Sequence, residues 1–240
     1  LAATAGTAVY SVKKIQNEMD NKKIPLMGVV GAFVFAAQMI NFTIPGTGSS
    51  GHIGGGMLLS ILLGPQAGFL TMASVLLIQA LFFADGGLLA FGCNVFNLGF
   101  YTSFIAFPLI YKKLVNKDSK PGRIIAACVL STVVGLQLGS LSVVFETLLS
   151  GKTELPFTAF LILMQPVHLA IGLVEGFITA AVVLFVWKAR PEILSVNIHN
   201  EKSMSFKSVI IILAVVTVVI GGGLAYFASS YPDGLEWSIE

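Results

Sequence analysis

Long uncharged runs of apolar residues dominate the chain. No Asp, Glu, Lys or Arg occurs between Ile24 and Ala84, and further uncharged runs follow at Gly86–Tyr111, Ile124–Phe145 and Ser208–Tyr231. Each run is long enough to cross about 30 Å of hydrocarbon at about 1.5 Å per helical residue. The runs are continuous and do not alternate with a period of two, which excludes barrel strands. The pattern therefore predicts an all-α, polytopic membrane helical bundle.

One predicted span is unusually short. Ile53–Leu63 has about half the usual length, and Gly64-Pro65 then ends one helix and begins the next. Such a segment is expected to be tilted, or broken and shielded by protein instead of lipid. The full prediction is a six-helix core with one further N-terminal and one further C-terminal helix: Leu1–Val12, Pro25–Ile44, Ile53–Leu63, Pro65–Ala84, Leu88–Tyr111, Ile124–Leu149, a segment within Phe157–Trp187, and Ser208–Ala228.

Basic residues predict the orientation of the spans. They form three clusters, at Lys13–Lys23, Lys112–Arg123 and Lys188–Lys207. Cytoplasmic loops of membrane proteins collect Lys and Arg, so all three clusters are placed inside. The resulting expectation puts His52, Asp85 and Lys152 outside, and Lys22, Lys117 and Arg190 inside.

Composition and charge exclude several classes of protein. Hydrophobic residues make up 55% of the chain and charged residues 11%, whereas a soluble domain carries about 25% charged residues. The net charge of +2 is too small to indicate nucleic-acid binding. Cys93 and Cys128 lie in apolar runs without CxxC spacing, which favours buried thiols over a metal or redox role. The sequence has no GxxxxGK[ST] motif, so any energy that the protein needs must come from another subunit or from an ion gradient.

The loop Phe42–Gly56, which reads FTIPGTGSSGHIGGG, is the most informative segment. It holds six glycines and His52, the one imidazole among the predicted outer loops. Glycine-rich backbone can approach a ligand closely. A histidine in such a loop is more often a polar surface residue than a ligand. His52 is nevertheless a candidate ligand, because its loop leads into the span that is too short for an ordinary lipid-facing helix.

Four segments, in this order, resemble the CbiM/NikM type of cobalt and nickel substrate-binding (S) components of energy-coupling factor (ECF) transporters. They are PGTGSSGHIGGG (45–56), LLGPQAGF (62–69), QALFFADGGLLAFGCNVFN (79–97) and HLAIGLVEGFITAAVV (168–183). The later PDGLEW (232–237) is similar to a small accessory membrane component of nickel systems, NikN. The resemblance implies an S-component-like domain over 1–190 and the start of a fused accessory segment over 191–240.

The resemblance also implies a function. The chain would capture Ni²⁺ or Co²⁺ from outside as a transported substrate and would be no enzyme, with no bound catalytic cofactor. Its partners would be an ECF transmembrane coupling (T) protein and two ATPase subunits, with a further small accessory component as an open possibility, in a prokaryotic inner membrane. No nucleic acid is implied.

The resemblance places the metal among nitrogen ligands. In the family, an N-terminal Met-His pair and a histidine that matches His52 hold the ion. The chain opens on Leu1 within an apolar stretch, so this pair is expected upstream of Leu1. A terminal amine, a deprotonated amide and imidazoles form a square-planar set that suits Ni²⁺.

Further polar residues are predicted to support the loop. Asn94, three residues before Asn97 on one helix face, is expected to hydrogen-bond the loop or its histidine, with helix–helix bonding as the alternative. Ser50 and Asp85 are assigned similar supporting roles.

Two polar residues lie within the last predicted core span. His168 and Glu175 are two helical turns apart, and Glu175 falls near mid-membrane. An ionisable group at that depth is costly, so a functional role and an internally bonded structural role both remain open. His168 is expected to pack as a neutral histidine.

Gly28, Ala32 and Ala36 place small side chains along one helix ridge, which lets another helix approach closely. The resemblance implies that this ridge docks on the coupling protein, while internal packing is the alternative.

Two other functions fit parts of the sequence. Gly48–Gly51 matches a GxSG pattern, so Ser50 as nucleophile and His168 as base would make an intramembrane serine protease. A small-solute carrier without metal preference is the second alternative.

Overall fold

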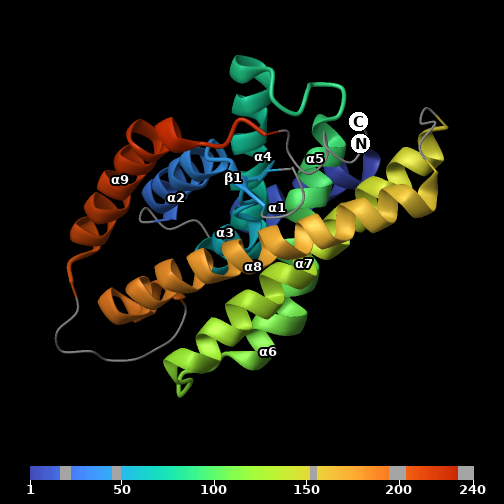
Figure 1. The fold of residues 1–240 in the computed structure, drawn as a ribbon. Helices are drawn as coiled ribbons and strands as arrows, with labels where there is room; N and C mark the ends of the chain where they lie inside the picture. The colour runs from blue at the N-terminus through green and yellow to red at the C-terminus, as the bar shows by residue number, and fades with distance from the viewer. Residues whose placement is uncertain (17–22, 45–49, 152–155, 195–203, 232–240) are drawn as a thin grey trace.

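The computed structural model describes residues 1–16, 23–44, 50–151, 156–194 and 204–231, and these are almost entirely helical (Figure 1). The predicted all-α class is confirmed. The α-helices are α1 (Ala2–Gln16), α2 (Lys23–Gln38), α3 (Gly56–Leu63), α4 (Pro65–Ile78), α5 (Phe91–Val95), α6 (Lys112–Leu114), α7 (Pro121–Ser150), α8 (Phe157–Ala189) and α9 (Phe206–Gly222). π-Helical segments at Gln79–Phe83 and Phe96–Tyr111 extend α4 and join α5 to α6, and 3₁₀ turns follow at Pro191–Leu194 and Leu224–Phe227.

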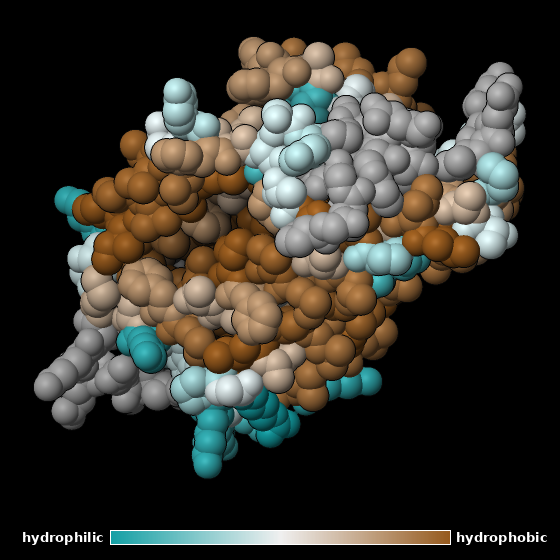
Figure 2. Space-filling model, in the orientation of Figure 1, coloured by the Kyte–Doolittle hydropathy of each residue, from teal (hydrophilic) through white to brown (hydrophobic). Residues whose placement is uncertain are grey.

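Five continuous stretches are long and apolar enough to cross a membrane: Pro65–Phe83, Phe91–Leu114, Pro121–Ser150, Phe157–Ala189 and Phe206–Phe227. The shorter apolar α2 and the buried α3 complete the predicted core of six helices, with α1 and α9 added to it. The molecule is a multi-pass membrane protein. Figure 2 shows apolar side chains over most of one face, with hydrophilic ones gathered along the lower edge, where Figure 1 places α6.

Two predicted helix ends are wrong. The span predicted over Pro25–Ile44 ends at Gln38, because Phe42–Thr43 (β1) pairs antiparallel with Ser50–Gly51 (β2). The span predicted from Leu88 begins at Phe91, because Gly86 and Gly87 adopt positive φ values of 73° and 67° in the preceding turn. In both cases local turn and strand chemistry overrides a continuous apolar run.

The short span is an eight-residue helix, α3, and all eight of its residues are buried. Gly55 (φ 77°) precedes it and Gly64 (φ 84°) ends it, both in conformations that other residues adopt only with strain. α3 lies inside the bundle in contact with α2, α4, α7 and α8. The prediction that protein shields this segment is confirmed.

The basic clusters lie at one end of the bundle. Lys23, Lys117 and Arg190, one from each cluster, line a single cavity. His52 and Asp85 line a different cavity. This separation agrees with the predicted topology, and which end is cytoplasmic stays a prediction. Lys22 and Lys152 lie outside the described residues.

The predicted docking ridge is only partly free. Gly28 and Ala32 are exposed, but Ala36 is buried. A methyl group added at Gly221 of α9 would lie 3.4 Å from Cβ of Ala36. α9 packs along α2 and covers this end of the ridge (Figure 1). The assignment of Ala36 to partner docking is therefore corrected to packing within the chain.

We expect Gly68→Ala to destabilise the protein by about 1–3 kcal/mol, the usual cost of overpacking. A Cβ at Gly68 would lie 2.9 Å from backbone atoms of Leu59 and Ser60, so α3 and α4 would have to separate. Gly28→Ala is the matched control, because nothing lies within 4 Å of its added methyl. Thermal unfolding in detergent should show a lowered midpoint for Gly68→Ala alone. Equal midpoints for the two variants would contradict the close α3–α4 contact.

Candidate metal-binding site

His52 follows β2 at the entrance to α3. Its side chain is half-buried, and Nδ1 lies 3.1 Å from the carbonyl oxygen of Ile53. A carbonyl oxygen can only accept, so Nδ1 carries the proton in this contact. The other ring nitrogen, Nε2, then presents its lone pair, which is the form of imidazole that binds a metal ion.

The carboxyl group of Glu175 holds the loop from the side of α8. Its Oε2 accepts the N–H of Gly54 at 2.6 Å, and its Oε1 accepts the N–H of Gly55 at 2.9 Å. Glu175 is completely buried. A buried carboxyl group is costly unless it is hydrogen-bonded, and here both oxygens have donors. Because Gly55 is the residue directly before α3, the carboxyl group also sits at the positive end of that helix.

Two glutamines hold the same peptide from the other side. Gln38 Nε2 donates to the carbonyl oxygen of Gly54 at 2.6 Å, and Gln79 Nε2 donates to Gln38 Oε1 at 2.8 Å. Both glutamines are 4% exposed. The N–H of Gly54 is therefore bonded to a side chain of α8, and its carbonyl oxygen to a side chain of α2. Gln79, in the π-helical end of α4, in turn holds the side chain of Gln38. We call Glu175, Gln38 and Gln79 the loop clamp.

The three consecutive glycines permit this close approach. A Cβ at Gly54 would lie 3.3 Å from Glu175 Oε2, and one at Gly56 would meet the carbonyl oxygen of Leu98. Gly55 has φ 77°, and a Cβ there would overlap Val34. Any side chain at these positions would push the loop away from its donors and acceptors.

A cavity of about 190 Å³ lies beside the clamped loop. Its polar lining includes four of the predicted site residues, His52, Asp85, Asn94 and His168, and also Asn97. It also includes Gln38 and Gln79 of the loop clamp. The structure thus brings together residues from the loop, from the turn at Asp85, and from α2, α5, α8 and both π-helical segments.

Asn94, Asn97 and His168 each have a hydrogen-bond partner in this region. Asn94 Nδ2 donates to the carbonyl oxygen of Gly86 at 2.8 Å, so its recorded bond stabilises the turn after Asp85 instead of the loop of His52. Asn97 Nδ2 donates to Glu146 Oε2 at 2.9 Å. His168 Nδ1 lies 2.9 Å from the carbonyl oxygen of Met164, one turn earlier on α8.

Ser50 contributes its backbone to β2, and its side chain lies outside the described part of the chain. Among the described residues, no three His, Cys, Asp or Glu side chains are grouped so that they could hold a metal ion. His52 belongs to the loop and lines the cavity, so it remains the candidate ligand of the loop.

Sequence reasoning missed Gln38 and Gln79. Both interrupt otherwise apolar spans, and an amide inside a membrane helix needs a hydrogen-bond partner. A polar residue that interrupts an apolar span is the sequence signal by which both glutamines could have been found.

A polytopic helical bundle that holds a glycine-rich histidine loop beside a polar cavity defines a membrane transport component. Residues 1–193 match the family model described as the cobalt uptake substrate-specific transmembrane region, and residues 207–240 match the PDGLE domain. The chain belongs to this cobalt uptake family, and it is a metal transport component of the CbiM/NikM type with a fused C-terminal segment.

Named relatives agree with this assignment. A relative from Archaeoglobus fulgidus, whose name describes a fused nickel transport protein NikMN, is 36% identical over 95% of this chain and 72% of its own length. The cobalt transport protein CbiM of Sorangium cellulosum is 32% identical over 75% of this chain and 80% of its own. The crystal structure of a transition metal transporter matches with a TM-score of 0.67 at 31% identity, over 78% of this chain and 86% of that one.

We expect Glu175→Gln to loosen the loop while the bundle stays folded. A glutamine offers one oxygen and one NH₂ group, so one of the two glycine N–H groups would face a donor and lose its acceptor. An unsatisfied buried group costs about 1–3 kcal/mol, which predicts roughly 5- to 150-fold faster amide exchange in the loop if local opening governs it.

Hydrogen–deuterium exchange of peptides covering residues 52–58 measures this change. Glu146→Gln is the matched control, since it is another glutamate within a span but is bonded to Asn97 and not to the loop. Equal exchange in the two variants would contradict the assignment of Glu175 as the anchor of the loop.

Proposed function

We propose that this chain is the substrate-binding component of an ECF-type importer, which captures Ni²⁺ or Co²⁺ from outside for ATP-driven uptake. One observation carries the proposal: His52 lies on a loop fixed at both sides of the Gly54 peptide, with Nε2 available beside a polar cavity. A preorganised loop holds an imidazole in position before the ion arrives, which is what tight and selective metal binding needs. Family membership and the names of nickel and cobalt transport relatives support it.

The remaining ligands would come from the Met-His pair expected before Leu1. Leu1 packs against Gly92, and Thr4 Oγ1 donates to the carbonyl oxygen of Gly92 at 2.7 Å. Asn94, two residues further on, lines the cavity of His52. Residues directly before Leu1 would therefore start close to that cavity. A nitrogen-rich set with an imidazole suits Ni²⁺ and Co²⁺ better than it suits Mg²⁺ or Ca²⁺, which prefer oxygen.

The C-terminal segment would support the loop from outside the core. We assign residues 1–190 to the metal-binding domain and residues 191–240 to the accessory segment. The backbone N–H of Ser229 donates to the carbonyl oxygen of Asn41 at 2.7 Å, and Thr43 Oγ1 donates to Ser229 Oγ at 3.0 Å. These contacts join the accessory segment to β1, which pairs with Ser50–Gly51 directly before His52.

Docking on the coupling protein would use the open part of the small-residue ridge. Gly28 and Ala32 remain exposed on α2. A helix of the T protein could pack closely there, and the two ATPase subunits would act through it. A further accessory membrane component would join the same complex.

Transport also fits better than the protease alternative. The family that the chain belongs to is one of metal transport.

We expect His52→Ala to lower nickel affinity by at least about 100-fold, above the roughly 10- to 100-fold loss typical of outer partners. Water would replace an imidazole nitrogen and is a poorer ligand for a square-planar ion. His168→Ala should leave the affinity unchanged, and Ser50→Ala should weaken it modestly at most.

Titration calorimetry with Ni²⁺ and Co²⁺, on detergent-solubilised protein with a free native N-terminus, measures these affinities. Parental affinity in His52→Ala would refute the metal role of the loop. Loss of a proteolytic activity in Ser50→Ala would favour the protease instead.

A further inference from the structure

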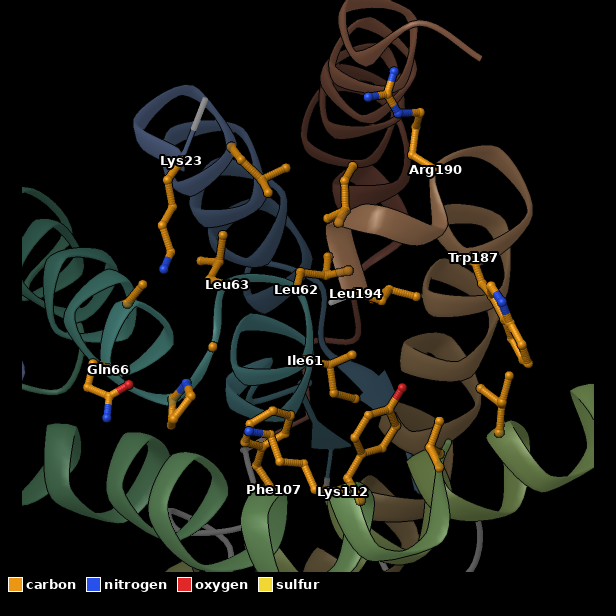
Figure 3. Close-up of a pocket in the computed structure, with 18 of the residues that line it drawn as sticks. Lys23, Ile61, Leu62, Leu63, Gln66, Phe107, Lys112, Trp187, Arg190 and Leu194 are labelled. Carbon is orange, nitrogen blue, oxygen red and sulfur yellow. The ribbon is translucent and has the colours of Figure 1, made fainter. Parts of the chain in front are cut away.

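A second and much larger cavity opens at the basic end of the bundle. Its volume is about 1110 Å³, at the upper end of the roughly 300–1,000 Å³ typical of small-molecule sites. Its floor is the break between α3 and α4, at Gly64-Pro65, and the last residues of α3 line it. Figure 3 shows Ile61, Leu62 and Leu194 near the middle of this space. The cavity shares no lining residue with the cavity of His52.

Cationic side chains surround this cavity from several elements. Lys23 begins α2, Lys112 begins α6, Lys117 follows α6, and Arg190 follows α8. The described residues that line the cavity include no Asp or Glu. Figure 3 shows Lys23, Lys112 and Arg190 on different sides of the apolar centre. Such a ring repels Ni²⁺ or Co²⁺, so the cavity suits an anion and not the transported cation.

Part of the cavity wall is apolar. Leu26, Ile61 and Ile124 are each no more than 6% exposed to solvent, and Phe107 is 5% exposed. Trp187 lies at the edge in Figure 3, close to the end of α8. Indole and basic side chains at the ends of spans are typical of the level of lipid headgroups. The cavity therefore combines buried apolar side chains with basic and aromatic ones.

We propose that this cavity is a binding site for an anionic phospholipid, with an acyl chain against α3 and the phosphate group among Lys23, Lys112 and Lys117. Basic pockets between membrane helices on the cytoplasmic side are known to select anionic headgroups. Two of the surrounding cations are already held at the mouth. Lys112 Nζ lies 5.1 Å from the centre of the Phe107 ring, and Arg190 donates to the carbonyl oxygen of Met204 at 3.0 Å.

A lipid in this position would contact the end of α3, whose other end begins at the clamped loop. It would fill the space beside the α3–α4 break and so resist the separation of these helices. Binding should therefore raise the thermal stability of the protein, because a ligand that binds only the folded state stabilises it.

The test compares two triple variants in detergent. Lys23→Gln/Lys112→Gln/Lys117→Gln removes three cations that line the cavity. Lys113→Gln/Lys120→Gln/Lys188→Gln removes three lysines of the basic clusters that do not line the cavity, so the net charge change is matched. Phosphatidylglycerol, phosphatidylcholine and inorganic phosphate are added separately, and Tm and retained lipid by native mass spectrometry are measured.

We expect phosphatidylglycerol to raise Tm by several degrees and to stay bound in the parent and the control variant, with at least tenfold weaker binding in the cavity variant. Phosphatidylcholine should bind less, and phosphate should leave Tm unchanged. If both triple variants lost lipid binding equally, general charge attraction would explain the binding, and the proposal would be overturned. Stabilisation by phosphate alone would indicate a simple anion site. Absence of lipid binding to the folded parent would favour an acidic segment of a partner protein as the occupant of the cavity. Either result overturns the lipid assignment.

Discussion

One hydrogen-bonded carboxyl group connects the middle of α8 to the loop that carries His52. Glu175 is fully buried, and its two oxygens take up the N–H groups of Gly54 and Gly55. Each of these groups would cost about 1–3 kcal/mol if it were left unsatisfied. The start of α3, the position of the loop and the orientation of the Gly54 carbonyl towards Gln38 all depend on this contact. Because the interior of a membrane holds no water, such polar groups can form hydrogen bonds only with one another.

α3 is the element that this contact positions. Its eight residues, about 12 Å of helix, separate the small polar cavity at His52 from the large basic cavity at Gly64-Pro65. Every residue of α3 is buried, and glycines on its neighbours allow backbones to approach. The same short helix thus presents a histidine loop at one end and the floor of a cationic cavity at the other. The proposed cation site and the proposed lipid site therefore lie at opposite ends of α3.

Much of this arrangement could be predicted from the sequence. Uncharged runs gave the all-α class and the spans, and the length of Ile53–Leu63 together with Gly64-Pro65 predicted a short helix shielded by protein. The glycine-rich loop and His52 stood out because six glycines surround one imidazole.

The contacts that fix the loop were beyond sequence reasoning. Glu175 and Gly54 are 121 residues apart, and nothing local in either segment specifies the partner. Gln38 and Gln79 were visible as polar interruptions, but their pairing depends on how α2 and α4 pack. Ala36 was assigned to a partner because a small-residue ridge does not reveal which helix covers it. The helix after Gly86 and Gly87 begins at Phe91 and not at Leu88, and the apolar run that starts at Gly86 does not reveal this difference.

The most direct test of this account is the nickel affinity of Glu175→Gln, measured by calorimetry on folded protein with a free native N-terminus. Glu175 touches the loop and not the ion, so a loss would show that the clamp positions His52. Loss of an outer partner of this kind typically costs about 10- to 100-fold in metal affinity. We predict that loss for Glu175→Gln and parental affinity for Glu146→Gln, whose carboxyl group pairs with Asn97. Parental affinity in Glu175→Gln would contradict the claim that the clamped loop forms the metal site.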